Sequence, residues 1–328
     1  MIEKIIDKAN SNQKAEKYVR RLLENAPLSL IYKTFRKKDI KVNGHWIKKD
    51  HVLMEGDTLR IYITEAQLAE FQKPREAVKA PLEYPIVYED ENILIVDKPA
   101  GLLVIGDDKE TRNTLARKVL DYLYYKGEFN PENHSFVPSP AHRLDRNTAG
   151  LVVFGKTNEA LSELTRLFKE RDDIHKKYIA IVVGSTDWEG TINKPLKKDS
   201  KTGMVTVCPV EKGGKTAITK YKTRTIGGGF SLIEVEILTG RTHQIRAHMA
   251  SIGHPIIGDG KYGDFNLNRE IKARYGWSNQ FLHAYKMSFS HPLPPLDYLA
   301  GKEFESKLGE EESKLLSTFF ETPRIWYE

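Results

Sequence analysis

The chain has 328 residues, of which 40% are hydrophobic and 29% are charged, a composition typical of one large or two ordinary globular domains. Its apolar runs are too short to span a membrane, and the polar start MIEKIIDKANSNQ lacks the apolar stretch of a secretory signal. A single cysteine, Cys208, excludes an internal disulfide and a thiolate-rich zinc site. These features predict a cytoplasmic protein with no membrane partner.

The net charge of +6 is concentrated near the N-terminus. Residues 1–65 carry 14 Lys/Arg against 9 Asp/Glu, whereas residues 66–328 carry 37 against 36. The cations are densest over 31–51, and they comprise Lys33, Arg36, Lys37, Lys38, Lys41, Lys48 and Lys49. Such clusters are typical of phosphate binding, although a solvated charged surface fits the charge pattern equally well.

The first elements in the chain are two short helices and a hairpin. Apolar spacing predicts an amphipathic helix over 13–26 and a second helix over 29–38 with Ser29 as its N-cap. Asn43-Gly44 is a strong hairpin-turn signal, and an alternating strand is expected over 58–63. Two helices with a small sheet form a compact module.

The composition then changes and marks a domain boundary. We expect a first domain over 1–65, a polar linker with two prolines over 66–83, and a larger second domain over 84–328. Its strands are predicted on both sides of a turn in 85–99 and at 150–155, 176–184, 215–225 and 230–238. Its helices are predicted at 114–125, at 157–170 with Thr157 as N-cap, and at 241–253 with Gly253 as the stop. Strands dominate without regular alternation with helices, which predicts an α+β fold with a mostly antiparallel sheet.

Charged residues crowd the segment AHRLDRNTAGL, residues 141–151, just before a buried strand. Loops held by a rigid scaffold are the usual place for catalytic groups. Asp145 lies between Arg143 and Arg146, which favour its ionised form, and a carboxylate can act as a nucleophile or stabilise a cationic sugar. The alternative interpretation is a structural salt bridge or helix cap.

A second polar segment, LTGRTHQIRAHM, covers residues 238–249. His243 and His248 are five residues apart and point away from each other on a helix, so the pattern does not predict a metal site. Anion binding, or pairing of this segment with Asp145, is better supported than a metal. A helix with a charged solvent face is the alternative.

These motifs occur in a characteristic order. K-P-x-G is followed by HRLD with T-x-G, then K-x-Y-I-A, TGRTHQIR-x-H, IGHPIIGD-x-x-YG and finally LHA. Over residues 86–295 the sequence resembles the RluA family of pseudouridine synthases. The N-terminal module resembles the α-L RNA-binding domain of ribosomal proteins and tyrosyl-tRNA synthetases, which precedes the catalytic domain in the large-subunit RluC and RluD subgroup.

The resemblance implies a role for particular residues. Asp145 matches the catalytic aspartate, Tyr178 the tyrosine that lies against the flipped uracil, and Arg246 the arginine that pairs with the aspartate. Arg143 matches the arginine that enters the RNA stack, and Leu238 matches an apolar residue that packs in the site.

Further contacts with RNA are expected from His142 and Arg241, which lie in the same motifs. They are also expected from five N-terminal cations, namely Lys33, Arg36, Lys37, Lys38 and Lys41. Asn147 and Ala149 depart from the family pattern, giving RNTAG where many members have RDTSG.

The family reaction moves the attachment of the sugar from ring nitrogen 1 of uracil to ring carbon 5. It involves no redox change, so no cofactor and no metal are expected. The base is stacked in RNA and must first be extruded, at a cost of about a few kcal/mol. The carboxylate could add to the anomeric carbon or assist removal of the proton on C2′, and the sequence does not choose between these routes.

Several alternatives stay open. Large-subunit ribosomal RNA is the favoured substrate because of the N-terminal module, and transfer RNA is the second candidate. An RNA-binding assembly factor without activity would need only that module. A glycosidase-type hydrolase would need two carboxylates around the bond, whereas the motifs supply one. A monomer is expected.

Overall fold

The computed structural model describes residues 1–7, 10–23, 26, 28–64, 67, 78–107, 110, 113–131, 136–200 and 202–320. The chain forms two compact units, Met1–Pro81 with Val119–Pro138, and Leu82–Lys118 with Ser139–Glu328. The first break falls inside the predicted linker, most of which lies outside the described residues. Nothing in the sequence predicted that 119–138 would join the first unit.

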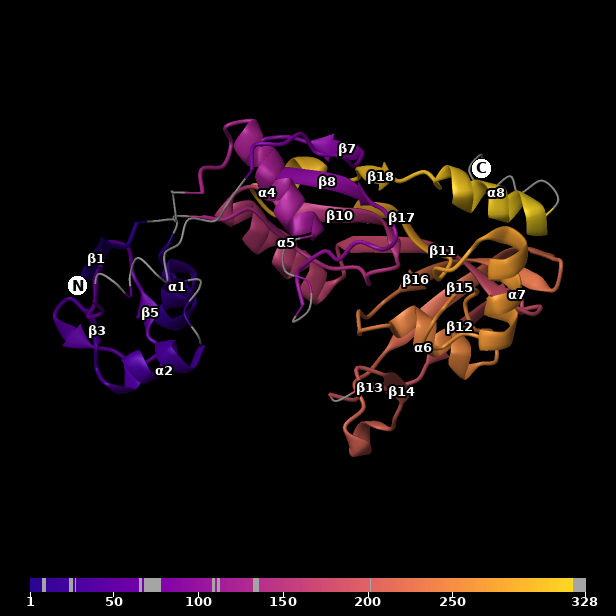
Figure 1. The fold of residues 1–328 in the computed structure, drawn as a ribbon, viewed down its shortest axis with the longest axis horizontal. Helices are drawn as coiled ribbons and strands as arrows, with labels where there is room; N and C mark the ends of the chain where they lie inside the picture. The colour runs from indigo at the N-terminus through magenta and orange to yellow at the C-terminus, as the bar shows by residue number, and fades with distance from the viewer. Residues whose placement is uncertain are drawn as a thin grey trace. The chain divides into compact units, whose positions relative to one another are not determined.

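The described part of the first unit before residue 82 contains two helices and short antiparallel strands (Figure 1). Its elements before residue 82 are β1 (Ile2–Ile5), β2 (Gln13–Lys14), α1 (Ala15–Leu22), α2 (Leu28–Arg36), β3 (Ile40–Val42), β4 (His45–Trp46), β5 (Val52–Leu53) and β6 (Thr58–Ile61). Four strands form a sheet in the order β1-β6-β3-β4, and β2 pairs with β5. Val19, Ile31 and Leu59 are among the buried side chains that join the helices and the sheet in one core.

Both predicted helices of this unit are present. The first is shorter than predicted because Gln13 and Lys14 pair with β5 instead of starting the helix. The Ser29 cap was wrong, because α2 begins at Leu28 and Ser29 lies in its first turn. The hairpin turn is confirmed: Asn43 and Gly44 have φ values of 50° and 86°, the left-handed pair that a tight two-residue turn requires.

The second unit is built on one large, mostly antiparallel sheet. Its strands are β7 (Ile86–Glu89), β8 (Ile93–Lys98), β9 (Ser139–Pro140), β10 (Ala149–Gly155), β11 (Ile174–Val183), β12 (Glu189–Asn193), β15 (Ile218–Gly227), β16 (Phe230–Ile237), β17 (Leu282–Phe289) and β18 (Glu303–Glu305). The order is β12-β15-β16-β11-β17-β10-β8-β7, with β18 on β17 and β9 on β10. Among the described strands, β10 with β17 is the one parallel pair.

Helices and a small hairpin complete this unit (Figure 1). The helices are α5 (Asn158–Glu170), α6 (Gln244–Ser251), α7 (Phe265–Tyr275) and α8 (Glu310–Phe319), and α4 (Leu115–Tyr125) crosses the boundary between the units. The hairpin of β13 (Leu196–Lys198) and β14 (Val205–Val207) projects beside α6. The short 3-10 turns are Val210–Lys212 and Asp297–Leu299. No described helix is long and apolar enough to cross a bilayer.

The predicted helix and strand boundaries hold well where the apolar pattern is strong. The Thr157 side chain accepts a hydrogen bond from Ala160 N, which confirms it as the N-cap of α5. The apolar face of α5 packs Leu164 and Leu167 against Leu151 and Val153 of β10. Gly253 follows α6 with φ 85°, the left-handed conformation that ends many helices. This core fixes the strand into which the Asp145 loop runs.

A glycine brings two of the sequence motifs together. Gly150 has φ 111°, and a Cβ atom there would overlap the backbone of Ala284. Gly150 and Ala284 are register partners in the parallel pair of β10 and β17. The T-x-G and LHA motifs are therefore one structural feature, a close backbone contact at the end of the Asp145 loop.

Candidate active site

A cavity of about 800 Å³ opens on the second unit, within the size range of small-ligand sites. It is bounded by the loop 141–148, by β11, and by the turn that leads into α6. Six of the residues predicted from the sequence line it together, namely His142, Arg143, Asp145, Tyr178, Arg241 and Arg246. Residues 101 positions apart therefore converge on one site.

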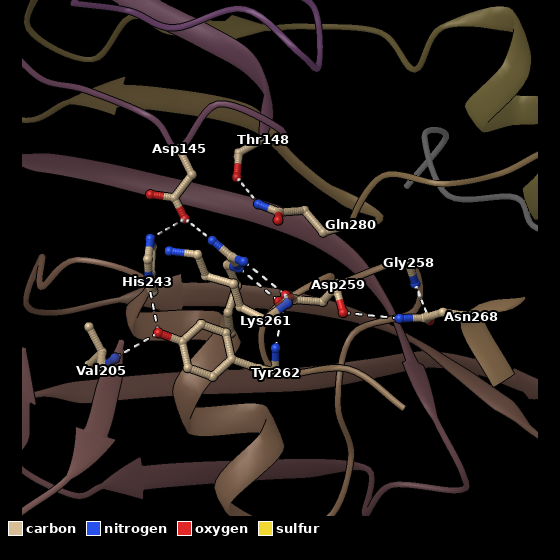
Figure 2. A network of polar contacts seen from close by, with 11 residues as sticks. Asp145, Thr148, Val205, His243, Gly258, Asp259, Lys261, Tyr262, Asn268 and Gln280 are labelled. Atoms are coloured by element: carbon tan, nitrogen blue, oxygen red, sulfur yellow. Dashed lines mark hydrogen bonds and ion pairs between the residues drawn. The ribbon is translucent and has the colours of Figure 1, made fainter. Parts of the chain in front are cut away.

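The loop that carries Asp145 is anchored by three hydrogen bonds. Thr148 N donates to the Asp145 carbonyl at 3.1 Å, and Gln280 Nε2 donates to Thr148 Oγ1 at 2.8 Å (Figure 2). Lys98 Nζ donates to the Arg146 carbonyl at 3.1 Å. A loop tied at these points holds its carboxylate in a fixed place, as catalysis requires.

Lys98 is fully buried beneath this loop. Its ammonium also donates to the carbonyls of Pro99 and Leu102, at 2.8 and 2.9 Å, so all three of its hydrogens have acceptors. Burial lowers the pKa of Lys98 to about 7, although the charges of Asp145 and Asp97 oppose that shift. The lysine of the K-P-x-G motif therefore supports the Asp145 loop.

Arg246 of α6 holds Asp145 from the other side. Its Nη1 donates to Asp145 Oδ2 at 2.8 Å, while Nε and Nη2 donate to the two oxygens of Asp259 at 2.7 and 2.8 Å. Burial alone would lower the pKa of Arg246, but the hydrogen bonds and charges of Asp259 and Asp145 raise it overall. The guanidinium is a permanent cation shared by two carboxylates.

Asp259 is the support of this arginine and is itself fully buried. Its Oδ1 accepts hydrogen bonds from the backbone N–H groups of Lys261 and Tyr262. Burial would raise the pKa of Asp259, yet these bonds and the Arg246 guanidinium lower it overall. The sequence did not predict a role for Asp259, the last residue of the IGHPIIGD motif, since its partner lies 13 residues away on another element.

His243 and Tyr262 extend the network, as Figure 2 shows. Tyr262 Oη accepts from Val205 N at 2.8 Å and lies 2.8 Å from His243 Nδ1. His243 Nε2 lies 3.9 Å from Asp145 Oδ2. Burial lowers the pKa of His243 to about 4, so the ring is neutral at pH 7. The Tyr262 hydroxyl hydrogen is free to reach Nδ1, which would leave the ring proton on Nε2, facing Asp145.

These contacts distinguish the two oxygens of Asp145. Arg246 and His243 both approach Oδ2, and no hydrogen bond reaches Oδ1 from any residue that the structure describes. Oδ1 is thus the oxygen available to a ligand in the cavity. The carboxyl side chain is about one quarter exposed, so it is reachable from the cavity.

Tyr178 of β11 lines the same cavity and is almost completely buried. Burial, together with the nearby Asp145 charge, raises its pKa well above the usual value. Its hydroxyl therefore stays protonated, and its ring offers a flat surface to a planar ligand.

The flanking residues of the HRLD motif take other places than the sequence suggested. Arg146 pairs with Asp107 at 3.6 Å, and Arg143 is exposed at the rim. Neither contacts the Asp145 carboxyl group; its arginine partner is Arg246. The hydrogen-bonded partner of Asp145 is therefore not one of its sequence neighbours, because a side chain pairs across space with whatever the fold brings near.

His142 forms part of the cavity wall. Its ring stacks on Phe168 with centroids 4.3 Å apart, and its Nε2 accepts from Val153 N at 3.3 Å. Burial and the neighbouring Lys176 charge lower the pKa of His142 well below its usual value. The neutral, stacked His142 ring therefore supports the cavity wall. The predicted contact of His142 with RNA stays a prediction.

Leu238 does not line the cavity and is 39% exposed. Its neighbour Ile237, at the end of β16, lines the cavity instead. Neighbouring residues of a strand point to opposite faces, so an error of one position places a side chain on the wrong face. The expectation that Leu238 packs in the site is corrected to Ile237.

Four further cations line the cavity without having been assigned a role from the sequence, namely Arg171, Lys176, Lys198 and Lys261. Arg171 follows α5 and Lys176 lies on β11, two residues before Tyr178. Among the described residues, no group of three or more His, Cys, Asp or Glu is placed to hold a metal ion; His248 instead contacts Thr219 Oγ1 and the Lys194 carbonyl, both at 2.8 Å.

The predicted N-terminal cations belong to the other unit. Lys33, Arg36, Lys37 and Lys38 are exposed, and Lys41 is half-buried. Lys38 lies over the Trp46 ring at 4.8 Å and Lys41 over the Tyr62 ring at 5.1 Å. Both rings are themselves exposed, by 50% and 42%. The unit therefore presents cations beside open aromatic surfaces.

Comparison with known proteins shows the family to which the chain belongs. A family model described as RNA pseudouridylate synthase matches residues 92–251. The ribosomal large subunit pseudouridine synthase C of Vibrio cholerae serotype O1 is 32% identical over 292 residues, 88% of each chain. The enzyme of the same name from Escherichia coli K12 is also 32% identical over 292 residues, 86% of each chain.

A solved structure shows the same fold. Human RNA Pseudouridylate Synthase Domain Containing 4 is 24% identical, with a TM-score of 0.55 over 71% of this chain and 91% of that chain. The chain belongs to the RNA pseudouridylate synthase family and is an α+β pseudouridine synthase. The resemblance to this family, its fold class and its enzymatic nature are thereby confirmed.

Proposed function

We propose that the enzyme isomerises uridines of large-subunit ribosomal RNA, with Asp145 Oδ1 as the reacting atom. The observation that carries the proposal is the Asp145–Arg246–Asp259 arrangement beside Tyr178 in one cavity. The relatives at 32% identity are named for the large ribosomal subunit. We propose further that the enzyme acts as a monomer in the cytoplasm.

The reaction breaks the C1′–N1 bond and forms a C1′–C5 bond, and the C5 proton is replaced by a proton on N1. Asp145 Oδ1 could add to C1′ or take the proton from C2′, and both routes use the same free oxygen. Arg246 would keep the carboxylate aimed by holding Oδ2, and a fixed donor costs no reorganisation during the reaction. Tyr178 would hold the uracil ring while the base turns.

The target uridine must leave the RNA stack before it can reach the cavity. Arg143 is exposed at the cavity rim and forms no ion pair with any residue that the structure describes. A guanidinium has a flat, cationic face that stacks on bases. We therefore assign to Arg143 the filling of the gap that the uridine leaves.

The N-terminal unit would bind the surrounding RNA. Exposed cations contribute phosphate contacts, and open aromatic rings stack on bases. Replacing Lys33, Arg36 and Lys37 by Gln should weaken RNA binding and reduce its salt dependence. The matched control replaces three exposed lysines of the other unit, Lys222, Lys272 and Lys314. Equal salt slopes in both triple variants would contradict the role of the N-terminal unit.

A two-carboxylate hydrolase has little support here. Asp107 is the one other carboxylate that lines the cavity among the described residues, and it pairs with Arg146 at 3.6 Å. The isomerase route leaves sugar and uracil joined, whereas a hydrolase would release free uracil.

The test is tritium release from RNA labelled at C5 of uridine, followed by carbodiimide-stop mapping of pseudouridine. Unmodified large-subunit ribosomal RNA and bulk transfer RNA are compared as substrates. We expect release from the ribosomal RNA, at one or a few mapped uridines, with no free uracil. Release from transfer RNA alone, or release of free uracil, would overturn the proposal.

A further inference from the structure

Two cations that line the cavity, Arg171 and Lys176, form no ion pair with any carboxylate of the described residues. Arg171 Nη1 is buried and has no hydrogen-bond partner. Lys176 lies with its ammonium 4.9 Å from the centroid of the Phe168 ring. Neither side chain forms an ion pair or hydrogen bond with any residue in the described ranges, and both line the cavity that holds Asp145.

This arrangement is costly for the folded protein. Like charges shielded from water destabilise each other and lose their hydration without a compensating partner. Burial, and then the Arg171 charge, lower the pKa of Lys176 to about 7. Burial, and then the charge of Arg241 at the rim, lower the pKa of Arg171. An apolar side chain at either position would avoid this cost.

The backbone around Arg171 is unusual as well. Arg171 caps α5 with φ 71°, a left-handed conformation that favours Gly or Asn. Its guanidinium lies against Gly240, where a Cβ atom would overlap it. The φ of Gly240 is not in the left-handed region, so the glycine is explained by the space that the guanidinium occupies. Strained backbone and a tailored neighbour commonly mark functional positions.

We propose that Arg171 and Lys176, with Arg241 at the rim, bind a phosphodiester that flanks the everted uridine. The inference rests on the proposed function, and it adds a binding subsite to it. A phosphodiester has one negative charge and two free oxygens, which suit a guanidinium and an ammonium together. A neutral uracil would offer carbonyl oxygens but would leave both charges uncompensated. Sugar at Asp145 and phosphate at this pair would fix the nucleotide at two points.

The test removes the charge from either side of the contact. RNA that the wild-type enzyme isomerises is prepared with 2′-deoxyuridine at the target and a deoxynucleotide before it. The linkage 5′ or 3′ to the target is then replaced by a neutral methylphosphonate. Dissociation constants are measured for the wild type and for the variant Arg171→Met/Lys176→Met. The control is Lys177→Met, which removes an adjacent lysine that pairs with Glu234 at 3.2 Å.

We expect one of the two neutral linkages to weaken wild-type binding by about tenfold or more, since each 1.4 kcal/mol is tenfold in affinity. The double variant should bind the parent RNA with a similar loss, and the same neutral linkage should cause no further loss. Lys177→Met should behave as the wild type. Losses that multiply at both linkages would overturn the proposal, because the cations would then contact something other than phosphate.

A second variant keeps both charges. Gly240→Ala should displace the Arg171 guanidinium, so that binding no longer responds to the same neutral linkage. This variant provides the test if the double variant does not fold.

Isomerisation of the parent RNA by the wild type is established first. Its absence would refute the proposed function, whereas isomerisation without coupling between cation and linkage would overturn the phosphate site alone.

Discussion

Two lysines of the second unit, the buried Lys98 and the half-buried Lys176, have opposite electrostatic surroundings. Lys98, beneath the Asp145 loop, donates to three carbonyl oxygens. Lys176, on β11, has none of these partners, and its ammonium lies over the Phe168 ring of α5. Burial lowers the pKa of both to about 7. The ammonium group thus supports the folded structure at Lys98, and at Lys176 it is available to an anionic ligand.

Two arginines of the cavity differ in the same way. Arg246 is shared between two carboxylates, Asp145 and Asp259, whereas Arg171 pairs with no carboxylate of the described residues. The side of the cavity at Arg246, where the cation is already paired with carboxylates, suits the chemical step, because its groups are aligned before the substrate arrives. The side at Arg171 and Lys176, where the cations are unpaired, suits binding, because an anionic ligand supplies the missing charge. Four substitutions test this division, from the largest expected effect to the smallest.

Asp145→Asn should lower the single-turnover rate of isomerisation by at least about 10³-fold. The amide keeps the size of the side chain and can accept from Arg246, so the fold should persist. Tritium release from C5-labelled RNA measures the rate. Asp107→Asn is the control in the same cavity, and its rate should change less than about threefold. A large effect of Asp107→Asn would favour a mechanism with two carboxylates.

Asp259→Asn should lower the free energy of unfolding by about 3 kcal/mol, because it breaks a buried ion pair. Denaturant unfolding measures the effect, and activity should fall as well, since Arg246 loses its support. The control is Glu303→Gln, which breaks an exposed ion pair with Lys286. That variant should cost less than about 1 kcal/mol. Equal losses would mean that Asp259 is no more structural than a surface residue.

Lys98→Met should destabilise the protein by about 2 kcal/mol, because three carbonyl oxygens lose their donor and only part of the loss is offset by removing a buried charge. Thermal unfolding at pH 7 measures this. A variant as stable as the wild type would show that the Asp145 loop does not depend on this anchor.

Lys176→Met, the same chemical change, should stabilise the protein. The pKa of Lys176 is about 7 in the folded state and 10.5 in its unperturbed form. Below pH 7 both states hold the proton, and the full cost of burying the charge is present. Between pH 7 and 10.5 the unfolded chain binds more protons than the folded one, so wild-type stability rises with pH.

The advantage of the variant should therefore be about 2 kcal/mol larger at pH 6 than at pH 9. Denaturant unfolding of both proteins at the two pH values measures the difference. Lys98 titrates in both proteins and cancels from it. If the stability difference between Lys176→Met and the wild type did not depend on pH, burial of the Lys176 ammonium would not destabilise the folded protein.

Local patterns predicted those parts of the second unit that local forces determine. The helix α5 and its Thr157 cap followed from apolar spacing and one side-chain oxygen. The resemblance placed Asp145 and Arg246 in one site, which no periodicity could do, since their hydrogen bond joins residues 101 apart. Asp259, Arg171 and Lys176 were missed because their roles depend on which partners the fold brings near.

Errors of one residue had clear physical causes. Leu238 was expected in the cavity, but strand alternation gives that place to Ile237. Ser29 was expected to cap a helix that begins one residue earlier. Register and helix ends are set by the pairing and packing of the whole chain, which a local pattern does not contain.

The central claim is that Asp145 and Arg246 serve the chemical step while Arg171 and Lys176 serve binding. Single-turnover kinetics at a series of enzyme concentrations test it most directly, because they separate the maximal rate from the half-saturating enzyme concentration. The account predicts that Asp145→Asn lowers the maximal rate and leaves half-saturation unchanged. It predicts that Lys176→Met raises half-saturation by about tenfold and leaves the maximal rate within about threefold. A fall in maximal rate without a change in half-saturation for Lys176→Met would contradict the account.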